Sequence, residues 1–79
     1  MIKLENIKKI NSIISCRILP EDAESYGFLV VDVVNRSIID YDLPDGYQWC
    51  KNHVIHAAEA LFRMALLNDI PSEKKVAWG

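Results

Sequence analysis

A long apolar segment from Asp45 to Asp69 constrains the fold of this 79-residue chain more than any other feature. Asp45 is a favourable helix N-cap, and Gln48 three residues later completes the pattern of a capping box. Neither proline nor glycine interrupts the segment between Gly46 and Pro71. The pattern predicts one long helix that follows a series of short strands.

Short segments with the composition of strands flank the predicted helix. They are residues 2–8, 12–19, 28–34 and 38–43, followed after the helix by a short edge strand in 72–79, where Val76 and Trp78 alternate with Lys75 and Ala77. The isoleucines near 2–8 also fit helical spacing, so that segment stays open between strand and helix. We expect a two-layer α+β fold in one domain, residues 1–79. It has a four-stranded, mainly antiparallel meander, one long helix packed on one face and a short C-terminal edge strand.

The hydrophobic pattern also sets the register of the hairpin formed by residues 28–34 and 38–43. A three-residue turn at 35–37 gives a continuous apolar face, with Val33 opposite Ile39, Val31 opposite Tyr41 and Leu29 opposite Leu43. On the other face, the same register sets Asp32 opposite Asp40. Because opposed like charges destabilise a sheet, we expect Arg17 on the neighbouring strand to compensate them.

The predicted helix is apolar around most of its circumference. One apolar face, with Val54 and Leu61, should cover the sheet, while Ile55, Phe62 and Leu66 flank it on one side and Trp49, Ala60 and Leu67 on the other. Residues 46–69 would span roughly 36 Å as a helix, whereas seven-residue strands span about 23 Å. The end of the helix should therefore overhang the sheet and expose apolar surface.

Apolar surface of this kind usually marks an interaction site. We predict that Trp49, Phe62, Leu66 and Leu67 contact a partner, most simply in a C2 homodimer, or else as an accessory subunit of a larger protein. The alternative is a helix that crosses the sheet diagonally, with its flanks covered by the N-terminal segment and the tail around Trp78.

Two groups of side chains could instead bind a metal ion. His53, His56 and Glu59 follow one another at three-residue steps, a spacing that can supply two or three ligands. The spacing differs from the His-Glu-x-x-His pattern of metalloproteases, so this metal-binding protein or metal-dependent enzyme is the alternative function. Asp32, Asp40 and Asp42 could gather around a hard cation, but we favour a solvated sheet face with Arg17 nearby.

Composition favours a non-enzymatic interaction protein. The chain has 9 basic and 11 acidic residues and a formal net charge of −2, so we expect neither nucleic acid nor membrane as a partner. The N-terminal residues lack the apolar run of a signal peptide, and two cysteines are too few for a disulfide scaffold, so we expect a cytoplasmic protein with buried thiols at Cys16 and Cys50. The sequence contains no nucleophile or phosphate-binding motif, and we predict no cofactor and no catalytic residue.

Overall fold

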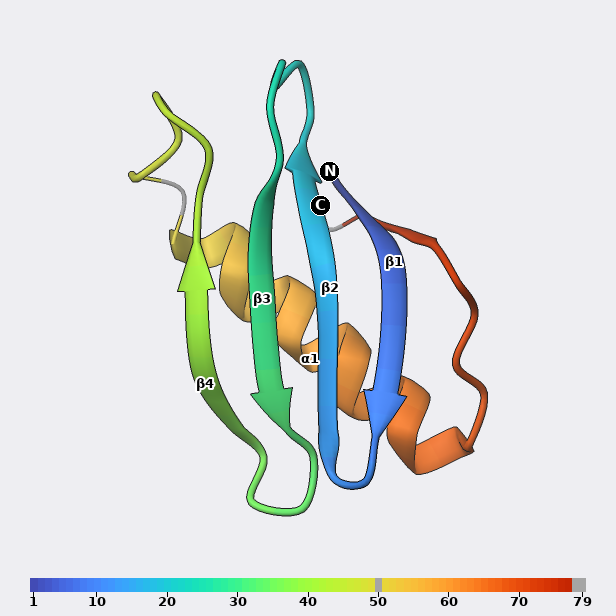
Figure 1. Cartoon of the computed structure of the whole chain (residues 1–79). Helices are drawn as coiled ribbons and strands as arrows, with labels where there is room; N and C mark the ends of the chain where they lie inside the picture. Colours follow the sequence, from blue (N-terminus) through green and yellow to red (C-terminus); the bar gives the residue numbers. More distant parts are fainter. Residues whose placement is uncertain (50, 78–79) are drawn as a thin grey trace.

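Five strands form one antiparallel sheet, and one helix packs on it, in a computed structural model that describes residues 1–49 and 51–77 (Figure 1). Along the chain the elements are β1 (Ile2–Ile10), β2 (Ile13–Pro20), β3 (Gly27–Asp32), β4 (Ser37–Asp42), α1 (Lys51–Leu67) and β5 (Lys74–Val76). The strand order is β4-β3-β2-β1-β5, so β5 joins the edge of β1. The predicted α+β fold with its C-terminal edge strand is confirmed, although Trp78 lies outside the described residues.

β1 is a strand over its whole length, which decides between the two alternatives for residues 2–8. Its pairing with β2 shifts in the middle of the strand, where Asn6 takes a positive φ of 54°. This bulge supplies the extra residue that brings Ile7 onto the same face as Leu4, because side chains otherwise alternate between faces. Ile7 is buried as a result, and its backbone N–H donates to the carbonyl of Ser72 (3.0 Å).

The turn between β3 and β4 is organised by Asp32. Its carboxylate accepts hydrogen bonds from the backbone N–H groups of Val34 (2.9 Å) and Asn35 (3.1 Å) and from the Asn35 side chain (2.9 Å). The bonds from Asn35, and then that from Val34, hold the pKa of Asp32 below its usual value. The turn spans residues 33–36, with Arg36 in the left-handed conformation at φ 52°. The predicted three-residue turn is therefore wrong, because the Asp32 carboxylate caps a longer one.

The hairpin register changes with the turn. Leu29 lies opposite Tyr41 and Val31 opposite Ile38, which leaves Ile39 as the extra residue of a bulge. Asp40 lies opposite Val30, so the predicted opposition of two carboxylates does not arise. Arg17 does not act as their compensator, because its guanidinium lies over the ring of Tyr26, 4.9 Å from the centroid.

α1 begins at Lys51, so the predicted helix start at Asp45 is wrong. The backbone N–H of Tyr47 donates to the carbonyl of Pro44 (3.0 Å), and Gly46 has a positive φ of 87°. This is the geometry of a type II turn, which needs a residue such as glycine at its third position. Asp45 is thus an exposed turn residue rather than an N-cap.

Two side chains that follow the type II turn stabilise it through hydrogen bonds to the Gly46 backbone. The Gln48 side-chain oxygen accepts a hydrogen bond from the backbone N–H of Gly46 (3.1 Å), and the Trp49 indole N–H donates to the Gly46 carbonyl (2.8 Å). Gln48 and Trp49 therefore bond within the turn instead of entering the helix. Gln48, the second residue of the predicted capping box, therefore stabilises this turn instead of the helix start.

The shorter helix removes the predicted overhang. Seventeen residues span about 25 Å, which is less than the roughly 30 Å of a nine-residue strand such as β1. The helix instead crosses the sheet diagonally (Figure 1) and packs mainly against β3, β1 and β5. This crossing is the alternative arrangement considered from the sequence.

The helix ends at Leu67, two residues before the predicted end at Asp69. Asn68 takes the left-handed conformation at φ 53°, and its N–H donates to the carbonyl of Ala65 (3.2 Å). The N–H of Asp69 donates to the carbonyl of Met64 (3.0 Å). This pair of bonds is a Schellman motif, which satisfies carbonyls that the last turn would otherwise leave open.

The core lies between the predicted apolar face of α1 and the sheet. The helix contributes Val54, Ala57, Ala58, Leu61 and Met64, and fully buried partners on the strands include Ile14, Ile18, Leu29 and Val31. Each large apolar side chain buried in this way stabilises the fold by about 1.5–3 kcal/mol. Cys16 belongs to this core, and its burial raises the thiol pKa to about 12, as its predicted inward position implies. Cys50 lies outside the described residues.

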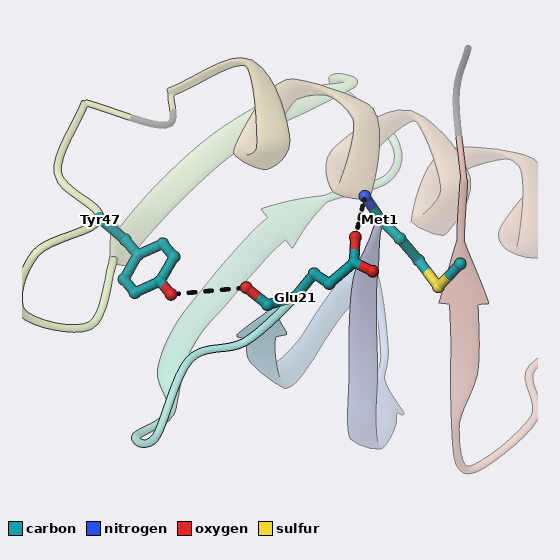
Figure 2. A network of polar contacts seen from close by, with 3 residues as sticks. All are labelled: Met1, Glu21 and Tyr47. Atoms are coloured by element: carbon teal, nitrogen blue, oxygen red, sulfur yellow. Dashed lines mark hydrogen bonds and ion pairs between the residues drawn. The ribbon is translucent and has the colours of Figure 1, made fainter.

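A small polar network ties the N-terminus to two loops (Figure 2). The Met1 ammonium lies 3.7 Å from Glu21 Oε2, and the backbone N–H of Glu21 donates to the Met1 carbonyl (3.1 Å). The Tyr47 hydroxyl donates to the Glu21 carbonyl (3.4 Å). The β2–β3 loop therefore contacts both the start of β1 and the turn that precedes α1.

Gly27 occupies a position with no room for a side chain. A Cβ there would collide with the carbonyl oxygen of Asp42 and lie 3.1 Å from the Cα of Leu43. We expect Gly27→Ala to push β4 away from β3 and lower the free energy of unfolding by about 1–3 kcal/mol in chemical denaturation. The control, Ser15→Ala on an exposed strand position, should change it by less than about 0.5 kcal/mol. If Gly27→Ala and Ser15→Ala unfolded at the same denaturant concentration, the close contact between Gly27 and β4 would be contradicted.

The turn before α1 gives a second prediction. Gly46→Ala should cost about 1–2 kcal/mol, because alanine is strained at a positive φ even though the space around Gly46 is open. Asp45→Ala should change the free energy of unfolding by less than about 0.5 kcal/mol, because Asp45 is exposed and caps no helix. Thermal denaturation of both variants is the measurement. A loss of about 0.5–2 kcal/mol at Asp45 would instead indicate a helix cap.

Candidate functional site

β4 is an edge strand that the helix leaves largely uncovered. All six of its residues are exposed. Ile38 and Tyr41 lie opposite Val31 and Leu29, which are fully buried, so they belong to the helix side of the sheet. They nevertheless stay 38% and 39% exposed, because α1 packs mainly over β3, β1 and β5. The helix side of β4 is therefore an open apolar surface.

One flank of α1 extends this surface. Ile55, Phe62 and Leu66 lie within about 40° of one another around the helix. The Arg36 guanidinium, from the β3–β4 turn, lies 5.1 Å from the centroid of the Phe62 ring, so this flank faces the β3–β4 hairpin. Ile55 and Leu66 are exposed. We call Ile38, Tyr41, Ile55 and Leu66 together the β4–α1 surface.

Charged side chains of both signs border the β4–α1 surface. Arg36, Glu59 and Arg63 line a shallow hollow with Leu66. Two bases and one acid in the same hollow give neither a strongly positive nor a strongly negative field. A partner that presents both signs in turn would suit this border better than a polyanion.

The four residues predicted to contact a partner do not form one patch. Leu66 and Leu67 are 78% and 69% exposed at the end of α1, whereas Trp49 is 77% exposed in the turn ahead of the helix. Phe62 is 9% exposed and belongs to the core cluster. The prediction that Phe62 faces outward is therefore wrong. It was inferred from an overhanging helix, whereas the diagonal helix turns this position toward the hairpin and beneath Arg36.

The other flank of α1 is only partly covered by the C-terminal segment, because Leu67 stays 69% exposed. Leu67 lies about 100° around the helix from Leu66, in a hollow of about 180 Å³ lined also by Ala60, Met64, Pro71 and Lys74. Ile70 and Val76 pack against the core from the same C-terminal segment. The volume is below the roughly 300–1,000 Å³ of small-molecule sites. This flank offers no deep pocket, and its exposed apolar surface is that of Leu67.

The histidines of the metal-binding alternative lie on α1 where the sequence puts them. His53 and His56 are half-buried, and Glu59 is exposed. Three-residue steps turn their directions by about 60° each around the helix, so the three side chains diverge. Across residues 1–49 and 51–77, no three His, Cys, Asp or Glu side chains are grouped in a way that could hold a metal ion. The geometry lends no support to a metal site at these residues or at Asp32, Asp40 and Asp42.

His53 has a distinct electrostatic environment. Its burial, then the positive N-terminal ammonium and His56, lowers its pKa from the usual value. Its ring meets the indole of Trp49 edge to face, with centroids 6.5 Å apart and planes at 83°. Burial therefore favours the neutral form of His53, which packs against Trp49 at the helix start.

The open face of the sheet carries a polar cluster that sequence reasoning missed. Lys3 Nζ lies 3.1 Å from Glu5 Oε2, and hydrogen bonds from Tyr26 and from Lys3 lower the pKa of Glu5. The same bond to Glu5 raises the pKa of Tyr26, whose ring stacks beneath Arg17. These side chains satisfy one another across β1, β2 and the start of β3. These residues become neighbours through the order of the strands, which their spacing in the sequence does not reveal.

Within residues 1–49 and 51–77, no helix is long and apolar enough to cross a membrane.

Comparison of the chain with protein-family models, with curated proteins and with solved structures found no significant match. The candidate site therefore rests on geometry alone.

The main feature missed from the sequence is the exposure of β4. The segment Ile38-Ile39-Asp40-Tyr41 has the composition of a strand, and it is the last strand of the meander before the helix. A terminal strand of a meander lies at an edge unless a later strand joins it. β5 joins β1 instead, so this signal, together with two adjacent isoleucines, could have identified the uncovered edge.

His53 predicts how stability depends on pH. Because its pKa in the folded protein is lowered, the unfolded chain takes up a proton more readily as the pH falls below about 6.5. We expect the melting temperature to fall between pH 7 and pH 5, and His53→Gln to flatten this part of the profile. Asn52→Gln, one residue away on an exposed position, is the control and should leave the profile as in the parent protein. An unchanged slope in His53→Gln would contradict the assignment.

Proposed function

We propose that this chain is a small, non-enzymatic interaction protein of the cytoplasm that works as a homodimer through the β4–α1 surface. The observation that carries the proposal is the exposure of Ile38 and Tyr41 on the helix side of the sheet. In a two-layer fold this side is normally buried against a helix. A second copy that covers β4 would complete the layer that α1 only partly fills.

The size of the chain supports oligomerisation. A domain of 79 residues buries only about 60–65% of the surface that its unfolded chain exposes, so it gains from further burial. A C2 dimer brings the same patch of both copies together and therefore requires a self-complementary patch. The apolar residues of the β4–α1 surface, bordered by Arg36, Glu59 and Arg63, fit that requirement.

Other features favour binding over catalysis. Burial raises the pKa of the Cys16 thiol to about 12, which disfavours the thiolate that a nucleophile would need. The hollow beside Leu67 is too small for most organic substrates. Exposed apolar side chains at a sheet edge are, by contrast, a common basis of protein–protein contact.

Two neighbouring leucines test the proposal. We expect the parent protein to sediment with twice the 9.0 kDa mass of one chain at high concentration. Leu66→Lys should raise the dissociation constant at least about tenfold, because it puts a charge into the proposed apolar contact, worth about 1.4 kcal/mol or more. Leu67→Lys, 69% exposed against 78% for Leu66 but on the flank turned away from β4, is the matched control and should leave association unchanged. Analytical ultracentrifugation from micromolar to millimolar concentration provides the comparison.

Two outcomes would contradict the proposal. A parent protein that stays monomeric at millimolar concentration would exclude the homodimer. A dimer weakened by Leu67→Lys but not by Leu66→Lys would put the contact on the other flank of α1. Both variants should keep the melting temperature of the isolated chain, since both side chains are mostly exposed.

A further inference from the structure

We infer that the two copies of the proposed homodimer pack helix against helix, with α1 antiparallel to the partner's α1 about a two-fold axis beside the middle of the helix. In this register Ile55 faces the partner's Leu66, and Glu59 lies beside the partner's Arg63. The inference rests on the proposed homodimer and specifies how its two chains meet. It follows from one stripe of side chains on the helix and from the order of its charges.

The stripe runs along the flank of α1 that faces the β3–β4 hairpin. Four residues spaced by four, three and four positions lie within about 60° of one another around the helix, namely Ile55, Glu59, Phe62 and Leu66. Phe62 is buried beneath Arg36, whereas Ile55 and Leu66 are exposed toward the two ends of the stripe. Side chains with this spacing form the ridges along which one helix packs against another.

An acid and a base lie in the middle of this flank. Glu59 and Arg63 are one helical turn apart, both are exposed, and they line the same shallow hollow with Leu66. Within the described part of the chain, no ion pair involves either of the two side chains. Both charges are therefore available for ion pairs with a second molecule.

The order of these charges selects antiparallel helices. Parallel helices about a two-fold axis would set Glu59 beside its own copy and Arg63 beside its own copy, and like charges across an interface repel each other. In antiparallel helices centred midway between Ile55 and Leu66, Glu59 and the partner's Arg63 differ by only about 1.5 Å in height along the axis. Two unlike pairs then form. The antiparallel stripe is thus complementary to itself in charge as well as in its apolar ends.

The same arrangement brings the second copy to β4. The stripe faces the hairpin, because Arg36 from its turn lies over Phe62. A helix packed against this flank lies roughly 8–10 Å from α1 between axes, toward the helix side of β4, where Ile38 and Tyr41 are exposed. The four residues of the β4–α1 surface therefore belong to one contact.

β4 enters this contact through side chains and not through its backbone. Ile39 forms a bulge, and Asp40 and Asp42 carry negative charge. Bulges and charged side chains protect an edge strand against pairing with another chain. A helix of the second copy approaches the face of the strand, so it leaves this protected edge unpaired.

Exchange of the two charges tests the register. Glu59→Arg and Arg63→Glu each turn two attractive pairs into two repulsive ones and should raise the dissociation constant about tenfold at low salt. The double variant Glu59→Arg/Arg63→Glu re-forms both pairs and should return the dissociation constant to within about threefold of the parent value. Glu24→Arg makes the same charge change on an exposed loop residue and should leave association unchanged. Analytical ultracentrifugation provides the comparison, and the changes should shrink at high salt.

Cysteine cross-linking gives an independent reading of the helix direction. In a Cys50→Ser background, with Cys16 buried in the core, the double variant Ile55→Cys/Leu66→Cys sets thiols of the two copies face to face. It should form a covalent dimer on mild oxidation, because facing residues of packed helices come within the range of a disulfide. Each single variant should stay uncross-linked, since the register separates the two copies of one residue by about 16 Å along the helix axis.

The outcomes separate the register from the proposed function. If the parent protein dimerises and Leu66→Lys weakens it, but the double charge variant associates no better than the single ones, the register is wrong and the homodimer stands. Single cysteine variants that cross-link as readily as the double variant would indicate parallel helices and also overturn the register. A parent protein that is monomeric at millimolar concentration would remove both the register and the proposed function.

Discussion

One helix cannot cover a sheet of five strands, and the rest of this structure follows from that mismatch. A helix with its side chains is about 10–12 Å wide, while strands lie about 4.8 Å apart, so five of them span roughly 20 Å between the outer axes. The diagonal course of α1 carries it behind β3, β2 and β1 (Figure 1), and its closest backbone contacts are with β3, β1 and β5. It leaves the helix side of β4 exposed, and the proposed homodimer is the simplest way to bury that surface.

The details of the β3–β4 hairpin decide what this exposed strand presents. Asp32 uses its carboxylate to cap the turn, and the longer turn shifts the pairing so that Ile39 bulges and Asp40 meets Val30. The shift keeps Tyr41 and Ile38 on the helix side. A local hydrogen bond of one side chain thus sets the face on which the apolar residues of the edge appear.

The sequence predicted exposed apolar surface, but it derived that exposure from a helix longer than the one in the structure. The predicted 45–69 helix was to overhang the sheet, and Phe62 was to be exposed by it. The turn at Gly46 shortens the helix to 17 residues, and Phe62 is buried. Of the predicted contact residues, Leu66 lies on the flank that faces β4, Leu67 lies on the opposite flank beside the C-terminal segment, and Trp49 is held in the turn by its bond to Gly46.

The fold class was within reach of the sequence because period-two and period-3.6 hydrophobic patterns are local properties. They were enough for the strands predicted at 12–19, 28–34 and 38–43, for the helix face with Val54 and Leu61, and for the helix end to within two residues, but they left residues 2–8 open between strand and helix. The start of α1, the hairpin register and the neighbours of β4 were not local. The start depended on a turn that competes with a capping box, and the register depended on one carboxylate. Which flank of the helix the C-terminal segment packs beside was decided by the return of β5 to β1, a pairing between residues at least seventy positions apart in the chain. Contacts of that range exist only once the chain has closed on itself, and so the tertiary structure alone decided which apolar side chains were left exposed.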